Sequence, residues 1–146
     1  MPEKTTLERA RQDKRAGKSP STQAGEFVRE EIEHIRHGKH GARSTKQAIA
    51  IGLSKARRAG VKLSPPKGAS ARTKASAASA TRAGRTHRKP SPKRSRAMLK
   101  RLKREGRGAV SRSALARQAT SAARRRGAAD RRRAARKAAK TRQRHH

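Results

Sequence analysis

An excess of positive charge limits what this chain can fold into. It carries 43 lysine and arginine residues against 9 aspartate and glutamate residues, which gives a formal net charge of +34 over 146 residues. Hydrophobic residues make up 30% of the chain and Phe27 is its one aromatic residue. Most of its length therefore cannot bury enough apolar surface to offset the entropy lost on ordering. The sequence predicts one small folded domain at most, together with basic segments that are partly disordered.

The same charge predicts the class of partner. Duplex DNA presents about one negative charge per ~1.7 Å of its axis, so this polycation matches roughly 60 Å of duplex. We therefore expect a nucleic acid, double-stranded DNA in particular. No apolar stretch fits a membrane span or a secretory signal, which predicts no membrane contact and a cytoplasmic location at the nucleoid. The chain has no cysteine, so disulfides and thiol chemistry are excluded.

Charge is unevenly distributed along the chain, and the division indicates its organisation. Residues 1–33 hold seven basic and seven acidic residues, whereas residues 34–146 hold thirty-six basic and two acidic ones. The predicted fold class is all-α. Helix signals and composition give four predicted parts: a short N-terminal helix over 1–18, a helical-hairpin domain over 19–63, a flexible basic linker over 64–95 and a polycationic helical tail over 96–146.

Capping signals bound the predicted hairpin. Ser19 followed by Pro20 is typical of a helix start, and Gly38 of a helix end. Ser44 then begins a second helix that ends at Gly60. We expect the two helices to lie antiparallel and to face each other through a few apolar side chains: Phe27, Val28, Ile32, Ile35, Ile49, Leu53, Val61 and Leu63. So thin a core predicts marginal stability or a homodimer through the hairpin.

The rest of the chain is poor in apolar residues. The predicted linker contains Pro, Gly, Ser, Ala, Thr and basic residues but no large apolar side chain, which is typical of a flexible or extended segment. The predicted tail is rich in Ala, Arg and Lys, which favour helix, but most of it has nothing to bury and its neighbouring arginines repel one another. We expect this Ala/Arg/Lys-rich helical tail to be partly disordered until an anion neutralises it.

The segment 19–63, SPSTQAGEFVREEIEHIRHGKHGARSTKQAIAIGLSKARRAGVKL, resembles a family of small, basic bacterial proteins. That family shares a domain of unknown function, and its members are sometimes labelled DNA-binding or plasmid-stabilisation proteins. The segments KPSPKRSRAMLKRLKREG and SRSALARQATSAARRR resemble recurring segments of its longer members. The resemblance implies a bacterial source and supplies no catalytic activity, cofactor or mapped site. The tail is also similar to linker-histone tails, in composition only.

The loop GKHG at 38–41 is the first candidate site. Its G-x-x-G spacing resembles the phosphate-clamping loop of KH domains, but no strand pattern surrounds it, and a helix-hairpin-helix DNA module would need a tighter turn. The alternative is a plain turn between two helices. Such a turn still favours phosphate where the helix after Ser44 presents free N–H groups beside basic side chains, here Lys39, His40, Arg43 and Lys46.

Three features of the sequence resemble chemical motifs: a group of histidines, a group of glutamates and a GKS sequence. His34, His37 and His40 lie near a helix end, where cationic side chains suit the helix dipole, and EHIRH is not the metal-binding H-E-x-x-H sequence. We interpret the glutamates of the same helix as charge balance. GKS at 17–19 lacks the first glycine of a phosphate-binding P-loop. We expect no metal, no cofactor and no enzymatic activity.

The sequence SPKR at 91–94 resembles the S-P-K-K turns of histone tails, which present two cations to the minor groove of DNA. A generic basic linker is the alternative interpretation. The candidate nucleic-acid-binding residues come from four places: the loop and the start of the second helix, the end of that helix, the SPKR sequence and the tail. They are Lys39, His40, Arg43, Lys46, Arg57, Arg58, Lys93, Arg94, Arg96, Lys100, Arg101, Lys103, Arg104, Arg124, Arg125, Arg126, Arg131, Arg132 and Arg133.

These observations predict a DNA-binding protein that does not read base sequence, with a histone-like role at the nucleoid or in plasmid maintenance. Two alternatives stay open. One is a basic protein associated with RNA or the ribosome, since ribosomal RNA attracts the same tails. The other is a module that binds a protein partner and is tethered to DNA by its tail.

Overall fold

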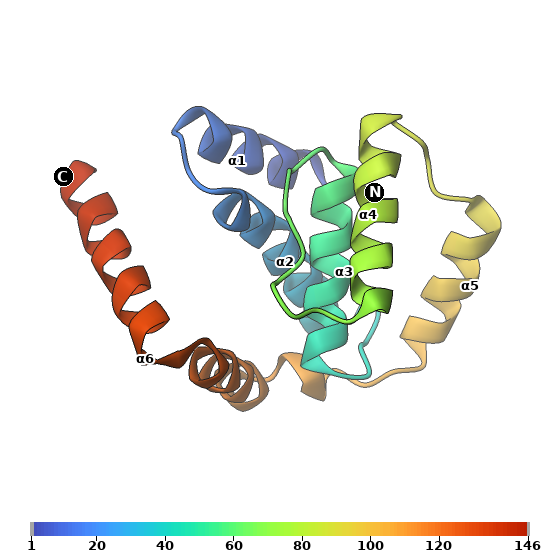
Figure 1. The fold of residues 1–146 in the computed structure, drawn as a ribbon. Helices are drawn as coiled ribbons and strands as arrows, with labels where there is room; N and C mark the ends of the chain where they lie inside the picture. The colour runs from blue at the N-terminus through green and yellow to red at the C-terminus, as the bar shows by residue number, and fades with distance from the viewer. Residues whose placement is uncertain (1, 146) are drawn as a thin grey trace. The chain divides into compact units, whose positions relative to one another are not determined.

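The computed structural model describes residues 2–145, and these contain helices but no strand (Figure 1). The prediction of an all-α fold is confirmed. The chain divides into two compact units, Met1–Val110 and Ser111–His146. The elements in chain order are α1 (Lys4–Arg15), α2 (Pro20–Arg36), α3 (Thr45–Arg58), α4 (Ala71–Arg85), α5 (Pro92–Lys103), the 3-10 turn η1 (Gly108–Val110) and α6 (Arg112–Arg144).

The starts of α2 and α3 follow from their capping residues. The side chain of Ser19 accepts a hydrogen bond from the backbone N–H of Thr22 at 3.4 Å, and Pro20 holds the first helical position. At α3, Ser44 accepts from the N–H of Gln47 at 3.1 Å. Each cap satisfies a backbone donor that the first turn of a helix leaves without an intrahelical partner. Both predicted N-caps are confirmed.

Two small apolar clusters hold the first unit together. The first contains Ala10, Ala24, Phe27, Ala56 and Val61, with Leu7, Leu53 and Leu63 packed against it. The second contains Ile35, Ala42, Ala48 and Val110, with Ile32 and Ala109 packed against it. Because five of the nine buried members are alanines, these clusters are stabilised by close approach of the backbones as much as by large side chains.

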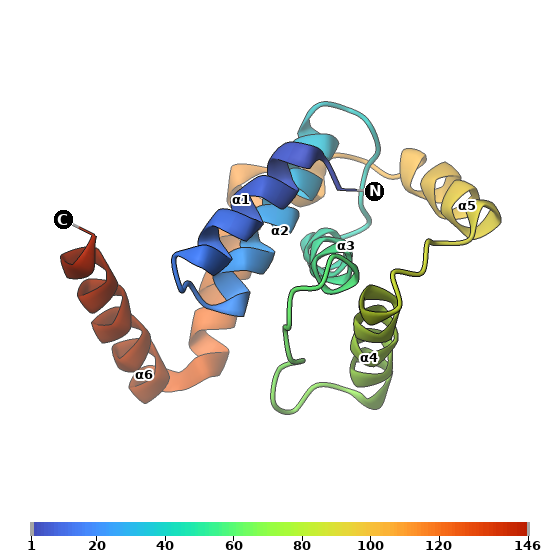
Figure 2. The same cartoon turned by 90° about the horizontal axis from the view of Figure 1, so that it is seen from above.

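The arrangement of α2 and α3 differs from the predicted antiparallel hairpin. Figure 2 shows α3 nearly end-on while α1 and α2 run across the view, so α3 crosses α2. Gly52 lies at the contact between the two helices, and a Cβ there would stand 2.6 Å from the Cα of Val28. This small residue lets the backbones meet closely. The pair is also extended on both sides, because α1 packs on α2 and α4 packs on α3.

Residues 64–95, predicted as a flexible linker, contain α4. Ser70 caps the helix by accepting a hydrogen bond from Thr73 N–H at 3.2 Å. Helix α4 packs against α3. Its buried side consists of four small residues, Ala77, Ala80, Ala83 and Gly84. A Cβ at Gly84 would lie 2.3 Å from the carbonyl oxygen of Arg57. The predicted linker was drawn from its lack of large apolar side chains, whereas α4 packs through an alanine and glycine face.

The beginning of the predicted tail is also part of the first unit. Gly41 N–H donates to the carbonyl of Leu102 at 2.9 Å, and Ala42 N–H donates to that of Gly106 at 3.1 Å. Leu102 is buried, and Val110 enters the second apolar cluster. The end of α5 and the turn after it therefore close over the loop between α2 and α3. The first unit ends at Val110, whereas the sequence predicts a tail that begins at residue 96.

The second unit consists of α6. The helix is interrupted at Gly127, whose φ of +77° and ψ of 163° are not helical. None of the residues of α6, all of which the structure describes, is buried. Helical structure in the tail is confirmed, and its partial disorder stays a prediction. No helix in the described part of the chain is both long enough and apolar enough to cross a membrane.

Candidate nucleic-acid interface

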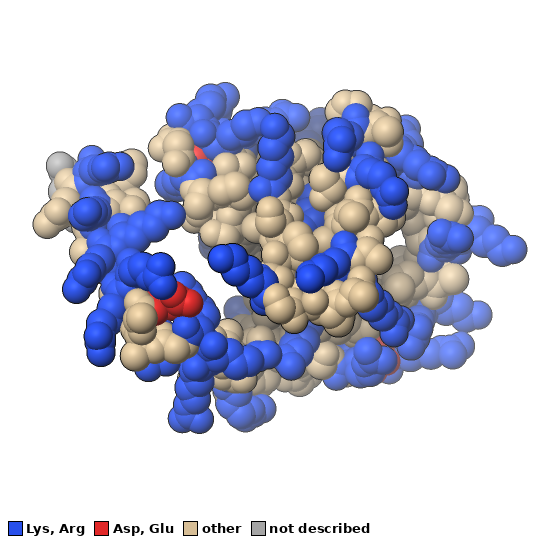
Figure 3. All heavy atoms as spheres, viewed as in Figure 1, with Lys and Arg blue, Asp and Glu red and all other residues tan. Residues whose placement is uncertain are grey.

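Most of the basic residues singled out in the sequence lie at the surface. Figure 3 shows lysine and arginine side chains over much of the visible face, with few acidic side chains among them. Seventeen of the nineteen candidates are exposed, namely Lys39, Arg43, Lys46, Arg58, Lys93, Arg94, Arg96, Lys100, Arg101, Lys103, Arg104, Arg124, Arg125, Arg126, Arg131, Arg132 and Arg133. The other two, His40 and Arg57, are buried.

Helix α5 presents a basic stripe beside an apolar edge. Lys93, Arg96, Lys100 and Lys103 follow one another at spacings of three or four residues, which places them along one side of the helix. Leu102 is buried, whereas Met98 and Leu99 are 50% and 42% exposed. Apart from Met98, Leu99 and the buried Leu102, α5 thus presents mainly basic side chains to solvent.

The SPKR sequence begins α5 and does not form a separate turn. Ser91 is the N-cap and Pro92 holds the first helical position. Proline suits that position because its ring fixes φ near the helical value and its missing N–H is not required there. Lys93 and Arg94 are consequently exposed in the first turn of a helix, which differs from the paired cations of an isolated histone-tail turn.

Helix α6 is the most strongly charged element. It carries thirteen basic residues and one acidic residue, Asp130. Asp130 forms an ion pair with Arg133, so nearly all of its positive charge lacks an acidic partner within α6. After the interruption at Gly127, basic residues recur at spacings of four, three and four residues: Arg133, Lys137, Lys140 and Arg144. This half of α6 therefore has a continuous cationic face.

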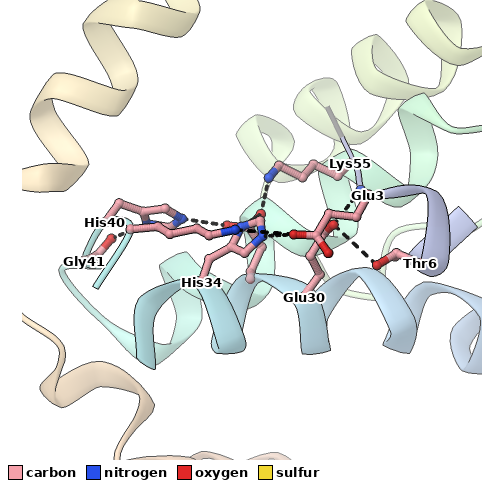
Figure 4. A network of polar contacts seen from close by, with 9 residues as sticks. Glu3, Thr6, Glu30, His34, His40, Gly41 and Lys55 are labelled. Atoms are coloured by element: carbon pink, nitrogen blue, oxygen red, sulfur yellow. Dashed lines mark hydrogen bonds and ion pairs between the residues drawn. The ribbon is translucent and has the colours of Figure 1, made fainter. Parts of the chain in front are cut away.

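The GKHG loop does not have the features of a phosphate clamp. The N–H groups of Gly41 and Ala42 bind carbonyls of the segment 102–106, and the N–H of Arg43 donates to the side chain of Gln47 at 2.7 Å. His40 is 9% exposed and points toward the interior (Figure 4). Three backbone donors of the loop are thus already occupied, and the side chain of His40, a candidate for a phosphate contact, is buried. Only the basic side chains of Lys39, Arg43 and Lys46 remain at the surface.

Arg57 has a structural role. It is buried, and its Nε donates a hydrogen bond to the carbonyl of Leu63 at 2.9 Å. Burial disfavours the charged guanidinium and lowers the pKa of Arg57. The side chain ties the end of α3 to the chain that follows it, so the prediction of a phosphate contact at Arg57 is not supported by its position.

Sequence reasoning missed a buried polar network on α2. Glu31 is 1% exposed and forms an ion pair with Lys55, and its Oε2 lies 3.2 Å from Nε2 of His40. The neighbouring carboxylate of Glu30 is also buried and accepts hydrogen bonds from the N–H of Glu3 at 2.6 Å and the hydroxyl of Thr6 at 3.3 Å. The network links α1, α2, α3 and the loop between α2 and α3 (Figure 4).

A local signal for this network exists in the sequence. Glu31 lies four residues after Phe27 and four before Ile35, and both of those are core residues. A carboxylate within an apolar helical stripe requires partners, because an unpaired buried charge is costly. That position distinguishes Glu31 from Glu33, the exposed glutamate of α2.

Glu3 and His34 form the outer part of the network. The Nε2 atom of His34 lies 3.1 Å from Oε1 of Glu3, and Nζ of Lys39 lies 3.4 Å from the same oxygen. The hydrogen bond from His34, followed by that from Lys39, holds the pKa of the Glu3 carboxyl below its usual value. A pocket of about 160 Å³ opens beside these residues and is lined in part by Glu3, Glu30, His34 and Lys39.

Comparison with known proteins identifies one shared region. Residues 11–68 match a family of unknown function (DUF6496), which fits the resemblance to a shared domain of unknown function. No curated protein and no solved structure matches the chain. The matched region contains the whole of α2 and α3 and the loop between them.

Proposed function

We propose that this protein binds double-stranded DNA without reading base sequence and acts at the bacterial nucleoid or in plasmid maintenance. The supporting observation is α6, which carries thirteen basic residues against one acidic residue and buries none of its residues. Arginines without acidic partners in the protein bind a polyanion favourably, because binding releases small counterions into solution. They also form forked hydrogen bonds with phosphate oxygens.

The shape of the cationic elements supports a duplex as the ligand. The major groove of B-DNA admits an α-helix, and phosphate contacts from its flanks position a protein without specifying sequence. Both halves of α6 and helix α5 offer such helices with exposed basic faces. Phe27, the one aromatic residue, is buried in the first apolar cluster. No phenylalanine, tyrosine or tryptophan is therefore available to stack on unpaired bases, which disfavours single-stranded RNA.

A second candidate function is a protein-partner module that its tail tethers to DNA. The exposed Met98 and Leu99 of α5 favour it, because two adjacent large apolar side chains at 50% and 42% exposure are typical of contact surfaces. DNA binding remains the first proposal because the charge extends over α5 and α6, whereas the apolar pair is confined to two adjacent residues of α5.

Competition between nucleic acids tests the proposal. Labelled 30-base-pair duplexes of two unrelated sequences and a structured RNA of the same length are titrated with the full chain over a salt series. We expect equal affinities for the two duplexes, weaker binding of the RNA, and affinity that falls steeply with salt. Preference for the RNA at about 0.15 M salt, or no binding in dilute buffer, would refute DNA as the ligand.

A further inference from the structure

The geometry points to a binding site for one divalent transition-metal ion of the zinc class, formed by Glu31, His34 and His40. Each of these residues offers one donor atom, and the donor atoms all lie within 4.8 Å of one another. Glu31 and His34 stand one turn apart on α2, and His40 comes from the loop that follows (Figure 4). This site is independent of the proposed DNA binding.

The end of α2 turns His40 back toward the helix. Gly38 has a φ of +75°, its N–H donates to the carbonyl of Ile35 at 3.1 Å, and the N–H of Lys39 donates to that of His34 at 2.9 Å. This pair of hydrogen bonds is a Schellman ending, which glycine permits because it lacks a Cβ. Gly41 is fixed in turn by its bond to Leu102. His40 is therefore held in place by backbone contacts on both sides.

The ring of His40 is oriented as a metal ligand. Its Nδ1 lies 2.9 Å from the carbonyl oxygen of Gly41. A carbonyl only accepts hydrogen bonds, so Nδ1 carries the proton and the lone pair of a neutral ring is on Nε2. That Nε2 lies 3.2 Å from Oε2 of Glu31. Two lone pairs at this separation are stabilised when a cation lies between them.

Glu31 has an oxygen without a hydrogen-bond partner. Glu31 is only 1% exposed, and its Oε2 is inaccessible to solvent. This oxygen accepts no hydrogen bond from any of the described residues. A buried carboxylate oxygen left in this state is costly. The proximity of His40 does not relieve it, because their contact is not a hydrogen bond. A metal ion bound to Oε2 would supply the missing partner.

His34 completes the donor set. Its Nε2 lies 3.1 Å from Oε1 of Glu3, a carboxylate that acts as acceptor, which leaves Nδ1 facing Oε1 of Glu31 at 3.9 Å. Histidines that bind metals usually donate their other N–H to a carboxylate or a backbone carbonyl. His34 has the first kind of partner, Glu3, and His40 has the second, Gly41. Both rings thus have an outer partner that fixes the tautomer.

The charges of the network leave room for a cation. Three carboxylates, from Glu3, Glu30 and Glu31, meet two ammonium groups, from Lys39 and Lys55. Lys55 is bonded to Oε1 of Glu31 and its side chain is 27% exposed, so it can move toward solvent. It is therefore a competitor of the metal for Glu31. Two imidazoles and one carboxylate are ligands preferred by Zn²⁺ and Co²⁺ over Mg²⁺ and Ca²⁺.

Cobalt titration of the full chain tests the site. Metal-free protein, in which His145 and His146 are replaced by alanine to remove the terminal histidines, is titrated with Co²⁺ and followed by visible absorption. We expect one Co²⁺ per chain, displaced by Zn²⁺ and unaffected by excess Mg²⁺. Circular dichroism of each variant establishes that it is folded.

Variants then assign the ligands. Glu31→Gln and His40→Ala are expected to weaken Co²⁺ binding by more than about 100-fold, and Glu3→Gln by about 10-fold through His34. His37→Ala, at an exposed histidine one residue beyond α2, is the matched control and should leave affinity unchanged. Lys55→Met should strengthen binding, because it removes the competing ammonium group. That gain cannot arise from a loss of folding.

A neighbouring set of donors supplies the discriminating control. Glu3, Glu30 and His34 also lie within 4.8 Å of one another and share His34 with the proposed site. If Glu31 is the ligand, Glu30→Gln should therefore weaken Co²⁺ binding far less than Glu31→Gln does. The proposal is overturned if Glu30→Gln abolishes binding while Glu31→Gln does not, or if His40→Ala binds Co²⁺ as tightly as the parent. It is likewise overturned if no Co²⁺ binds.

Discussion

Gly41 and Glu105 are in direct backbone contact: a Cβ at position 41 would lie 2.0 Å from the carbonyl oxygen of Glu105. This contact joins the loop after α2 to the turn after α5. Hydrogen bonds from Gly41 to Leu102 and from Ala42 to Gly106 accompany it. Helix α5, although strongly basic, is therefore anchored at its C-terminal end to the first unit and differs in this respect from α6.

Replacement of Gly41 by alanine should destabilise the first unit by about 1–3 kcal/mol, because the backbones must separate to admit the methyl group. Urea unfolding followed by circular dichroism measures the change. Gly25→Ala is the matched control: it lies inside α2 with nothing near its added Cβ, and should stabilise the helix by about 0.5–1 kcal/mol. Equal effects of the two substitutions would contradict the contact.

The docking of α4 predicts a difference between two neighbouring alanines. Ala80 is buried and Ala78 is exposed on the same helix. Ala80→Glu should release α4, because the carboxylate cannot be buried on the α3 side without a partner. Ala78→Glu changes the net charge equally and should leave α4 in place. Hydrogen exchange of the α4 amides measures this, and similar exchange in both variants would indicate a linker without stable structure.

The proposed DNA binding predicts that charge in α6 matters more than charge in α1. Substitution of Arg131, Arg132 and Arg133 by glutamine should reduce the slope of log affinity against log salt by about 3. The matched control replaces three exposed bases of α1, Arg11, Lys14 and Arg15, in a region where acids balance bases. It should leave the slope nearly unchanged. Equal loss in the two triple variants would argue for diffuse attraction by the whole chain.

Gly127 predicts a change in helix content. Alanine disfavours the positive φ that this residue adopts, so Gly127→Ala should convert α6 into one continuous helix. We expect a stronger ellipticity at 222 nm in the full chain. The exposed Ala129→Gly, two positions away, should have the opposite effect. Unchanged ellipticity in Gly127→Ala would mean that the interruption does not depend on glycine.

Local signals made part of the fold predictable. Ser19 and Ser44 each cap a helix through hydrogen bonds to residues three positions later. The start of each helix can therefore be predicted from a few consecutive residues. The packing of α4 on α3 could not be predicted in this way. Ala80 and Gly84 form no pattern of large apolar residues, and their burial depends on the position of α3. The hydrogen bond between Gly41 and Leu102 joins backbone atoms. Because every residue has these atoms, the identities of the side chains do not predict such a contact.

The candidate site shows the same division. Exposure of the arginines in α6 was predictable because that segment offers little for them to pack against. Burial of His40 and Arg57 was not, since their partners, Glu31 and the carbonyl of Leu63, are set by the fold. The charge of a side chain therefore predicted its chemistry, but the tertiary structure decided which charges are available to a ligand.

The interruption of α6 also determines how far it can follow a curved ligand. An unbroken helix of its 33 residues would be a rod of about 50 Å, longer than the ~34 Å repeat of a duplex, and its ends would project away as the groove turns. Two rods joined at Gly127 each stay within a single repeat. In the proposed DNA complex, the break at Gly127 would let the two halves of α6 follow different parts of a turning groove.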